Sequence, residues 1–204
     1  MSPARLARFS AAANGDKNLA LRLYIWNARL CEAFYLPLQV AEIAVRNAVH
    51  IPLRSRFGPA WFSSGKFLDQ MPKRYKEEVY ETVQREAARR GAAFTGDHVV
   101  AALTFGFWVH LLTSRYDNIL WQGGVSRSFP HITRGMTRAD VHEKVERLRD
   151  FRNLVAHHSA IFDRGPKAEY QNLVDILGLI CPDTLWLLGE LSNPDKVINA
   201  RPRI

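Results

Sequence analysis

The chain has 204 residues, of which 47% are hydrophobic, and it carries a formal net charge of +8. This length fits one domain with short extensions, and the hydrophobic content is that of a folded globular protein rather than a disordered chain. Charged residues such as Arg29 and Glu42 interrupt the longest apolar stretch, which argues against a membrane-spanning helix. The basic balance favours a polyanion as partner, and a solvated basic surface is the alternative.

Residues 1–16 are predicted to form a flexible leader. The segment from Met1 to Ala13 carries Arg5 and Arg8 without an acidic residue or an apolar signal-peptide core, so it resembles a transit peptide only faintly.

The two cysteines, Cys31 and Cys181, lie in apolar stretches without the C-x-x-C spacing of a metal or redox site. Buried, reduced thiols of a cytosolic protein explain them best, which predicts a cytoplasmic location.

Apolar spacing predicts helices nearly throughout the chain. A stripe at three- and four-residue spacing predicts a buried helical face between residues 19 and 57: Leu23, Trp26, Leu30, Phe34, Leu38, Ala41, Val45 and Val49. Pro37 is expected to kink or break this stretch into two helices. A more polar helix with a solvated, mixed-charge face is predicted over residues 72–90.

Two capping signals follow in the second half of the chain. Asp97 is a candidate cap for the apolar segment 99–112, which is expected to be central to the core. Thr137 followed by Asp140 predicts another helix start, and the apolar positions between residues 141 and 155 predict that most of this helix packs on the core.

The C-terminal part of the chain is also predicted to be helical, so the predicted fold class is all-α. A final helix is predicted over residues 168–191, with an interruption at Cys181-Pro182 as one option, and residues 191–204 are expected to form a loosely ordered tail. The predicted organisation is a single helical bundle domain over residues 17–190.

The segment Arg152-Asn153-Leu154-Val155-Ala156-His157-His158 carries the residues best suited to chemistry. A guanidinium binds phosphate through paired hydrogen bonds, and imidazole acts as acid or base near neutrality. On the predicted helix, Arg149, Asn153 and His157 share one stripe, and Arg152 lies on a neighbouring one. Together they could hold a phosphate and move its protons without a metal.

A structural explanation of the same spacing stays open. Arg and His often occupy the last turns of helices, where the helix dipole favours cations. A metal site is the weaker hypothesis, because His157 and His158 are adjacent and have no carboxylate or cysteine at ligand spacing.

A second polar group lies near the middle of the first predicted helix. Glu42 and Arg46 are four residues apart and can pair on one helical face, and Arg46-Asn47 followed by His50 resembles a shortened Arg-Asn-His group. An internal ion pair is the simpler explanation, and a supporting role beside an active cleft is the functional one.

At these residues the chain resembles the Abi-like abortive-infection proteins, a branch of the HEPN superfamily. The signature residues are Arg152-Asn153, Ala156-His157-His158 and Ile161-Phe162-Asp163-Arg164. Other blocks similar to the family in order and spacing are Trp26-Asn27, Leu30 with Glu32, Glu42 with Arg46-Asn47, and Phe105-Gly106-Phe107-Trp108. The resemblance covers about residues 17–190.

The resemblance implies an all-helical, metal-independent endoribonuclease that leaves a 2′,3′-cyclic phosphate and a 5′-hydroxyl end. Arg152 would bind the phosphate, Asn153 would be the motif's polar residue and His157 the catalytic histidine, although His158 also fits the spacing. It further implies an RNA substrate, no cofactor, a homodimer, and an RNA or protein antitoxin in a phage-defence or toxin-type system. The alternative is a non-catalytic RNA- or nucleotide-binding partner subunit.

Overall fold

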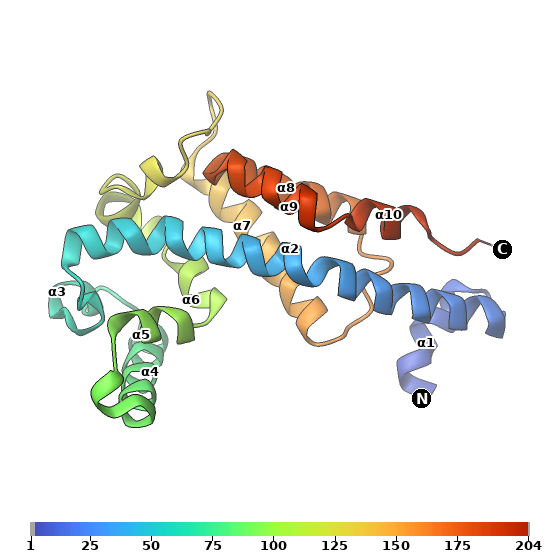
Figure 1. The fold of residues 1–204 in the computed structure, drawn as a ribbon, viewed down its shortest axis with the longest axis horizontal. Helices are drawn as coiled ribbons and strands as arrows, with labels where there is room; N and C mark the ends of the chain where they lie inside the picture. The colour runs from blue at the N-terminus through green and yellow to red at the C-terminus, as the bar shows by residue number, and fades with distance from the viewer. Residues whose placement is uncertain (1–2, 204) are drawn as a thin grey trace. The chain divides into compact units, whose positions relative to one another are not determined.

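The computed structural model describes residues 3–203, is 76% helical, and has no strand among those residues. Its helices are α1 (Pro3–Ala12), α2 (Lys17–Phe57), α3 (Gly65–Leu68), α4 (Lys73–Arg90), α5 (Gly96–Ala102), α6 (Phe105–His110), α7 (Arg138–Ala156), α8 (Pro166–Ile180), α9 (Pro182–Leu191) and α10 (Pro194–Asn199) (Figure 1). Short helical turns connect them: η1 (Trp61–Ser63), η2 (Gly91–Ala93), η3 (Ser114–Tyr116), η4 (Asp117–Trp121) and η5 (Val125–Ser128). The predicted all-α fold is confirmed.

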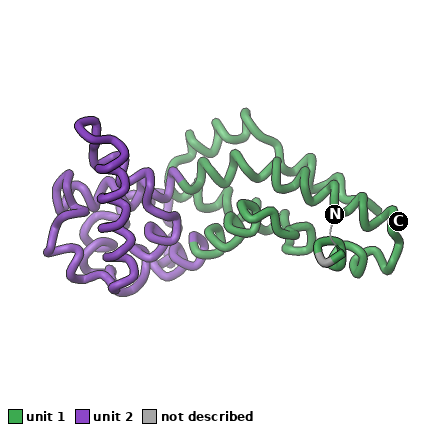
Figure 2. Tube along the Cα trace, turned by 90° about the horizontal axis from the view of Figure 1, so that it is seen from below, with its two compact units in different colours: residues 1–42, 146–204 green, residues 43–145 purple. Residues whose placement is uncertain are grey.

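The chain divides into two compact units, drawn in green and purple in Figure 2. The first unit comprises residues 1–42 and 146–204, and the second comprises residues 43–145. Helices α2 and α7 each contribute residues to both units. Within the described part of the chain, no helix is long and apolar enough to cross a membrane.

Helix α2 follows the predicted apolar stripe but not the predicted break. The stripe residues are all at most 4% exposed: Leu23, Trp26, Leu30, Phe34, Leu38, Ala41, Val45 and Val49. The helix runs without interruption through Pro37, so the predicted division into two helices is wrong. Proline removes one hydrogen bond at a cost of about 3 kcal/mol, and burial of the neighbouring Phe34 and Leu38 offsets it.

Aromatic packing joins three helices of the first unit. The ring of Phe34 on α2 meets Phe151 on α7 edge-on at 4.8 Å and Tyr170 on α8 at 6.1 Å. The apolar stripe predicted for α7 is confirmed, since Phe151 is 3% and Val155 5% exposed. These contacts bring the C-terminal half of α7 against α2.

Each end of the described chain contains a helix that the sequence analysis did not predict. Instead of a flexible leader, α1 packs on the first unit through Phe9, whose ring stacks on Phe162 at 4.8 Å. Instead of a loosely ordered tail, α10 follows α9 and buries Ile198. In both cases an apolar side chain gains enough contact to order a short segment. The predicted interruption at Cys181-Pro182 is confirmed.

Within the second unit, the apolar segment 99–112 forms two helices rather than one. The hydroxyl of Thr104 accepts a hydrogen bond from the Phe107 amide at 3.2 Å and caps α6. The Glu78 carboxylate accepts from both the amide and the hydroxyl of Thr104, at 3.0 and 2.7 Å. A local cap and a distant carboxylate therefore favour a break within an apolar run.

The helix starts of the second unit match the capping predictions in part. Asp140 accepts hydrogen bonds from the amide and hydroxyl of Thr137 at 2.6 and 2.7 Å, which confirms the predicted start of α7. The cap of α5 is Thr95 rather than Asp97, because the Thr95 amide donates to Nδ1 of His98 at 3.0 Å.

A half-buried histidine lies among the aromatic residues of the second unit. The His110 ring stacks on Tyr75 at 3.9 Å, and its Nε2 lies 3.2 Å from the Tyr116 hydroxyl. Desolvation, with the nearby charge of Arg115, lowers the pKa of His110 to about 4. Burial also raises the pKa of Tyr116 to about 12.

This environment predicts acid sensitivity. The unfolded chain binds a proton at His110 near pH 6.5 and the folded chain only near pH 4, so stability is lost as the pH falls through this window. We expect a loss of about 1–2 kcal/mol, discounted because the imidazole is partly exposed. Urea unfolding followed by circular dichroism at pH 7 and pH 4 measures it. An equal pH dependence in His110→Phe would contradict the assignment.

Candidate functional site

The C-terminal end of α7 carries the residues singled out in the sequence. The helix ends at Ala156, so His157 and His158 lie beyond its last turn rather than within it. His157 still donates its amide to the Asn153 carbonyl at 3.0 Å, the helical four-residue bond. The backbone of His157 therefore continues the helical hydrogen-bond pattern that the sequence predicts, although His157 lies outside the helix.

His158 reverses the chain direction after α7. Its amide bonds the Val155 carbonyl at 3.0 Å, and the Ser159 amide bonds the Leu154 carbonyl at 2.9 Å. This pair of bonds is the Schellman motif, which places its turning residue in the left-handed region. His158 occupies that position with φ of 52°, where glycine is the usual residue. The prediction that both histidines belong to the helix is wrong, because α7 ends at Ala156.

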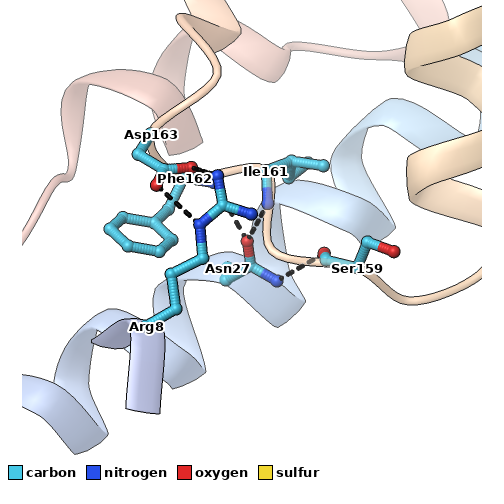
Figure 3. Close-up of polar contacts among 6 residues, drawn as sticks. All are labelled: Arg8, Asn27, Ser159, Ile161, Phe162 and Asp163. Carbon is cyan, nitrogen blue, oxygen red and sulfur yellow. Dashed lines mark hydrogen bonds and ion pairs between the residues drawn. The ribbon is translucent and has the colours of Figure 1, made fainter. Parts of the chain in front are cut away.

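Asn27 on α2 holds the loop that follows the histidines (Figure 3). Its side-chain oxygen accepts from the amides of Ile161 and Phe162 at 2.7 and 3.1 Å, and its side-chain nitrogen donates to the Ser159 carbonyl at 3.2 Å. Asn27 is only 6% exposed. One buried amide therefore satisfies three backbone groups of a loop far away in sequence.

Helix α1 contacts the same loop through two arginines. Arg8 donates to both oxygens of Asp163 at 2.8 Å, as Figure 3 shows. Arg5 donates to the His158 carbonyl at 3.1 Å. Both contacts are exposed, so each contributes little energy by itself. They place two guanidinium groups beside the histidine turn.

An open cleft of about 1210 Å³ lies over this turn. Its polar lining includes Arg5, Arg8, Asn27, Glu32, His157 and His158. Both imidazoles are exposed, and neither has a hydrogen-bond partner among residues 3–203. Two imidazoles and two cations thus share one solvent-accessible hollow, where an anion could reach them.

The motif arginine is engaged with a carboxylate. Arg152 binds Glu42 on α2 through Nε at 2.8 Å and through its NH2 group at 3.4 Å, and its NH1 group lies 3.4 Å from Asn153. The described residues that line the cleft do not include Arg152. Glu42 was expected to pair with Arg46; its partner is Arg152, because a two-point guanidinium–carboxylate contact forms where α7 packs on α2.

The other expected supporting residues are dispersed. Arg149 binds Asp150 at 2.8 Å and Glu146 at 3.3 Å, so it belongs to a charged surface of α7. Arg46 and Asn47 lie on the part of α2 that belongs to the second unit. The Nε atom of Arg46 is buried and has no hydrogen-bond partner within the described chain.

One of the two free cysteines lies at the cleft. Cys31 lines the cleft, and burial raises the pKa of its thiol, which therefore stays protonated near neutrality. Cys31 and Cys181 are free, and each is half-buried, whereas the sequence predicts buried thiols. No group of three or more His, Cys, Asp or Glu residues that could hold a metal ion occurs in residues 3–203.

Three residues of this site were not identified from the sequence as site residues. Arg5 and Arg8 were assigned to a flexible leader, and Asn27 was noted only as part of a motif block. The three-residue spacing of Arg5 and Arg8, in register with Leu6 and Phe9, is a signal of a short amphipathic helix. No local pattern shows which loop Asn27 would bind.

Comparisons of the chain with protein-family models, curated proteins and solved structures found no match. The resemblance to Abi-like proteins remains an expectation drawn from the motif residues.

Proposed function

We propose that this protein is an endoribonuclease that cleaves RNA at the cleft beside His157. The observation that carries the proposal is the shared lining of that cleft by His157, His158, Arg5 and Arg8. Exposed imidazoles that have no hydrogen-bond partner among residues 3–203 can exchange protons with a bound ligand, and guanidinium groups attract its phosphates. Acid–base catalysis of this kind needs no metal ion.

The chemistry is an attack by the 2′-hydroxyl on the adjacent phosphate. His157 takes the hydroxyl proton as the bond from the 2′-oxygen to phosphorus forms. As the bond to the 5′-oxygen breaks, protonated His158, which lines the same cleft, supplies a proton to the leaving group. The products are a 2′,3′-cyclic phosphate and a 5′-hydroxyl, so protons and bonds balance without another reactant.

Arg152 is not among the described residues that line the cleft, and we propose it as an additional phosphate ligand because part of its guanidinium is unpaired. Glu42 accepts two of its five N–H groups and Asn153 a third, which leaves two donors for a ligand. The side chain is 37% exposed, so solvent and ligand can reach it. Glu42 would then orient the guanidinium through its Nε and NH2 groups, and Asn153 would hold its NH1 group.

Non-catalytic binding of RNA or a nucleotide is the second candidate function. Asp163 and Glu42 already pair with Arg8 and Arg152, which lowers the positive charge available to stabilise a transition state. For this function, RNA or a nucleotide would bind in the cleft without being cleaved.

From the sequence resemblance, we further propose that the protein acts in the cytoplasm as part of a phage-defence or toxin-type system. An RNA or protein antitoxin would control it, and the protein would be a homodimer. Sedimentation of the purified chain would measure its oligomeric state. In a dimer, the second copy would bring another His157 and another Arg152.

Incubating the purified chain with mixed RNA in EDTA tests the proposed function. We expect cleavage to survive chelation and to be absent in the Arg152→Ala/His157→Ala variant. Chemical identification of the new ends should find the cyclic phosphate. Activity that requires an added divalent ion would contradict the mechanism, and RNA binding without cleavage would favour the second candidate.

A further inference from the structure

A second hollow in the first unit is more basic than the cleft. It has a volume of about 750 Å³ and lies between α2 and the C-terminal residues 196–203. Five cations line it: Arg22, Arg29, Lys196, Arg201 and Arg203. No Asp or Glu belongs to its described lining. We call this hollow the basic groove.

Two contacts hold the C-terminal segment against α2. The indole nitrogen of Trp26 donates to the Val197 carbonyl at 2.7 Å, and the Arg201 guanidinium lies 5.7 Å from the centre of the Trp26 ring. Trp26 is 4% exposed, so it anchors the segment without presenting a ring to ligands. The groove is therefore built by tertiary packing, which gathers cations from distant parts of the sequence.

The groove cations form no ion pair with a described carboxylate. Among the described residues, none of the five has a carboxylate within ion-pair distance, whereas Arg8 and Arg152 each pair with one. Unpaired like charges around one hollow repel one another and attract a polyanion. Four of the five are arginines, whose planar fork suits phosphate oxygens.

We infer that the basic groove binds the phosphate backbone of the RNA strand outside the cleaved segment. This inference rests on the proposed function for the choice of RNA as the polyanion. Both hollows use the same stretch of α2: Arg22 and Arg29 line the groove, while Asn27 and Cys31 line the cleft. The two sets of residues lie on different faces of that stretch, so a strand held in the groove would have to pass around α2 to enter the cleft.

An anionic membrane surface is the competing occupant. Leu21 and Ile25 are 46% and 52% exposed on the same stretch of α2, and apolar residues beside cations also suit a lipid headgroup layer. A concave hollow fits a strand better than a flat bilayer, because cations from α2 and from residues 196–203 can contact the strand from two sides.

Two double variants test the inference: Arg22→Ala/Arg29→Ala and Arg201→Ala/Arg203→Ala. The probe is a fluorescent single-stranded oligoribonucleotide that is 2′-O-methylated throughout and so cannot be cleaved. Fluorescence anisotropy across a potassium chloride series gives the affinity and its salt dependence. Each lost phosphate contact should make the negative slope of log affinity against log salt less steep by about 0.7, so by about 1.4 for each variant.

The matched control is Arg89→Ala/Arg134→Ala, which removes two exposed cations outside both hollows. It should keep the wild-type slope. Wild-type slopes in both groove variants would overturn the inference. The inference would also be overturned if the groove variants bind RNA like the wild type but lose binding to phosphatidylglycerol–phosphatidylcholine vesicles.

The binding and cleavage assays separate the two proposals. If the wild-type chain cleaves RNA in EDTA but the groove variants bind like wild type, the groove fails and the nuclease stands. If the wild-type chain cleaves nothing while the groove variants lose salt-dependent binding, the nuclease fails and the groove stands.

Discussion

Replacing His157 with alanine is expected to slow RNA cleavage by about 10²- to 10⁴-fold, the usual contribution of a positioned acid or base. The imidazole is exposed on the cleft and has no described internal partner, so its loss should leave folding nearly unchanged. RNA affinity should also persist, because phosphate contacts to cations supply most of the binding. Single-turnover cleavage of a labelled RNA measures the rate, and anisotropy measures the affinity.

A substitution at the neighbouring His158 must tolerate the positive φ of its backbone. At φ of 52°, asparagine is better tolerated than most residues, so His158→Asn removes the imidazole with little strain. Under the proposed mechanism this variant also slows cleavage. Full activity of His157→Ala with an inactive His158→Asn would transfer the leading role to His158. Full activity of both would remove the histidines from the chemistry.

Replacing Asn27 with alanine is expected to lower the free energy of unfolding by about 2–6 kcal/mol. The change leaves the amides of Ile161 and Phe162 buried without their acceptor, and each unsatisfied group costs about 1–3 kcal/mol. Urea unfolding followed by circular dichroism measures the loss. Hydrogen exchange at the same two amides should accelerate, because the loop opens more often.

Gln39→Ala is the matched control for Asn27, since Gln39 is an exposed amide on the same helix. It should change the free energy of unfolding by less than about 0.5 kcal/mol. A loss below about 1 kcal/mol in Asn27→Ala, with unchanged exchange at Ile161 and Phe162, would show that the loop does not depend on this side chain.

The Asn27 variant also bears on function. The side chain bonds the Ser159 carbonyl and thereby fixes the loop directly after His158. Cleavage should therefore fall in Asn27→Ala even at temperatures where the protein stays folded. Asn27 acts through the position of that loop, so its effect should appear together with the change in amide exchange.

Local patterns predict several elements of this fold. The apolar stripe of α2, the Thr137–Asp140 start of α7 and the interruption at Cys181-Pro182 all follow from residues within one or two helical turns. Side-chain periodicity and capping are short-range effects, so they can be identified along the chain. The candidate catalytic segment was located the same way, although the turn at His158 was not foreseen.

Local sequence patterns did not predict which residues far apart in the sequence form ion pairs and hydrogen bonds. Glu42 stands one turn from Arg46 yet binds Arg152, and Asn27 bonds a loop more than a hundred residues away. Pairing of this kind depends on which helices pack together, and packing also keeps α2 continuous through Pro37. Composition and periodicity thus specify a basic, all-helical chain with an Arg–His segment. The cleft and the basic groove exist only because tertiary packing brings distant helix faces within hydrogen-bonding distance.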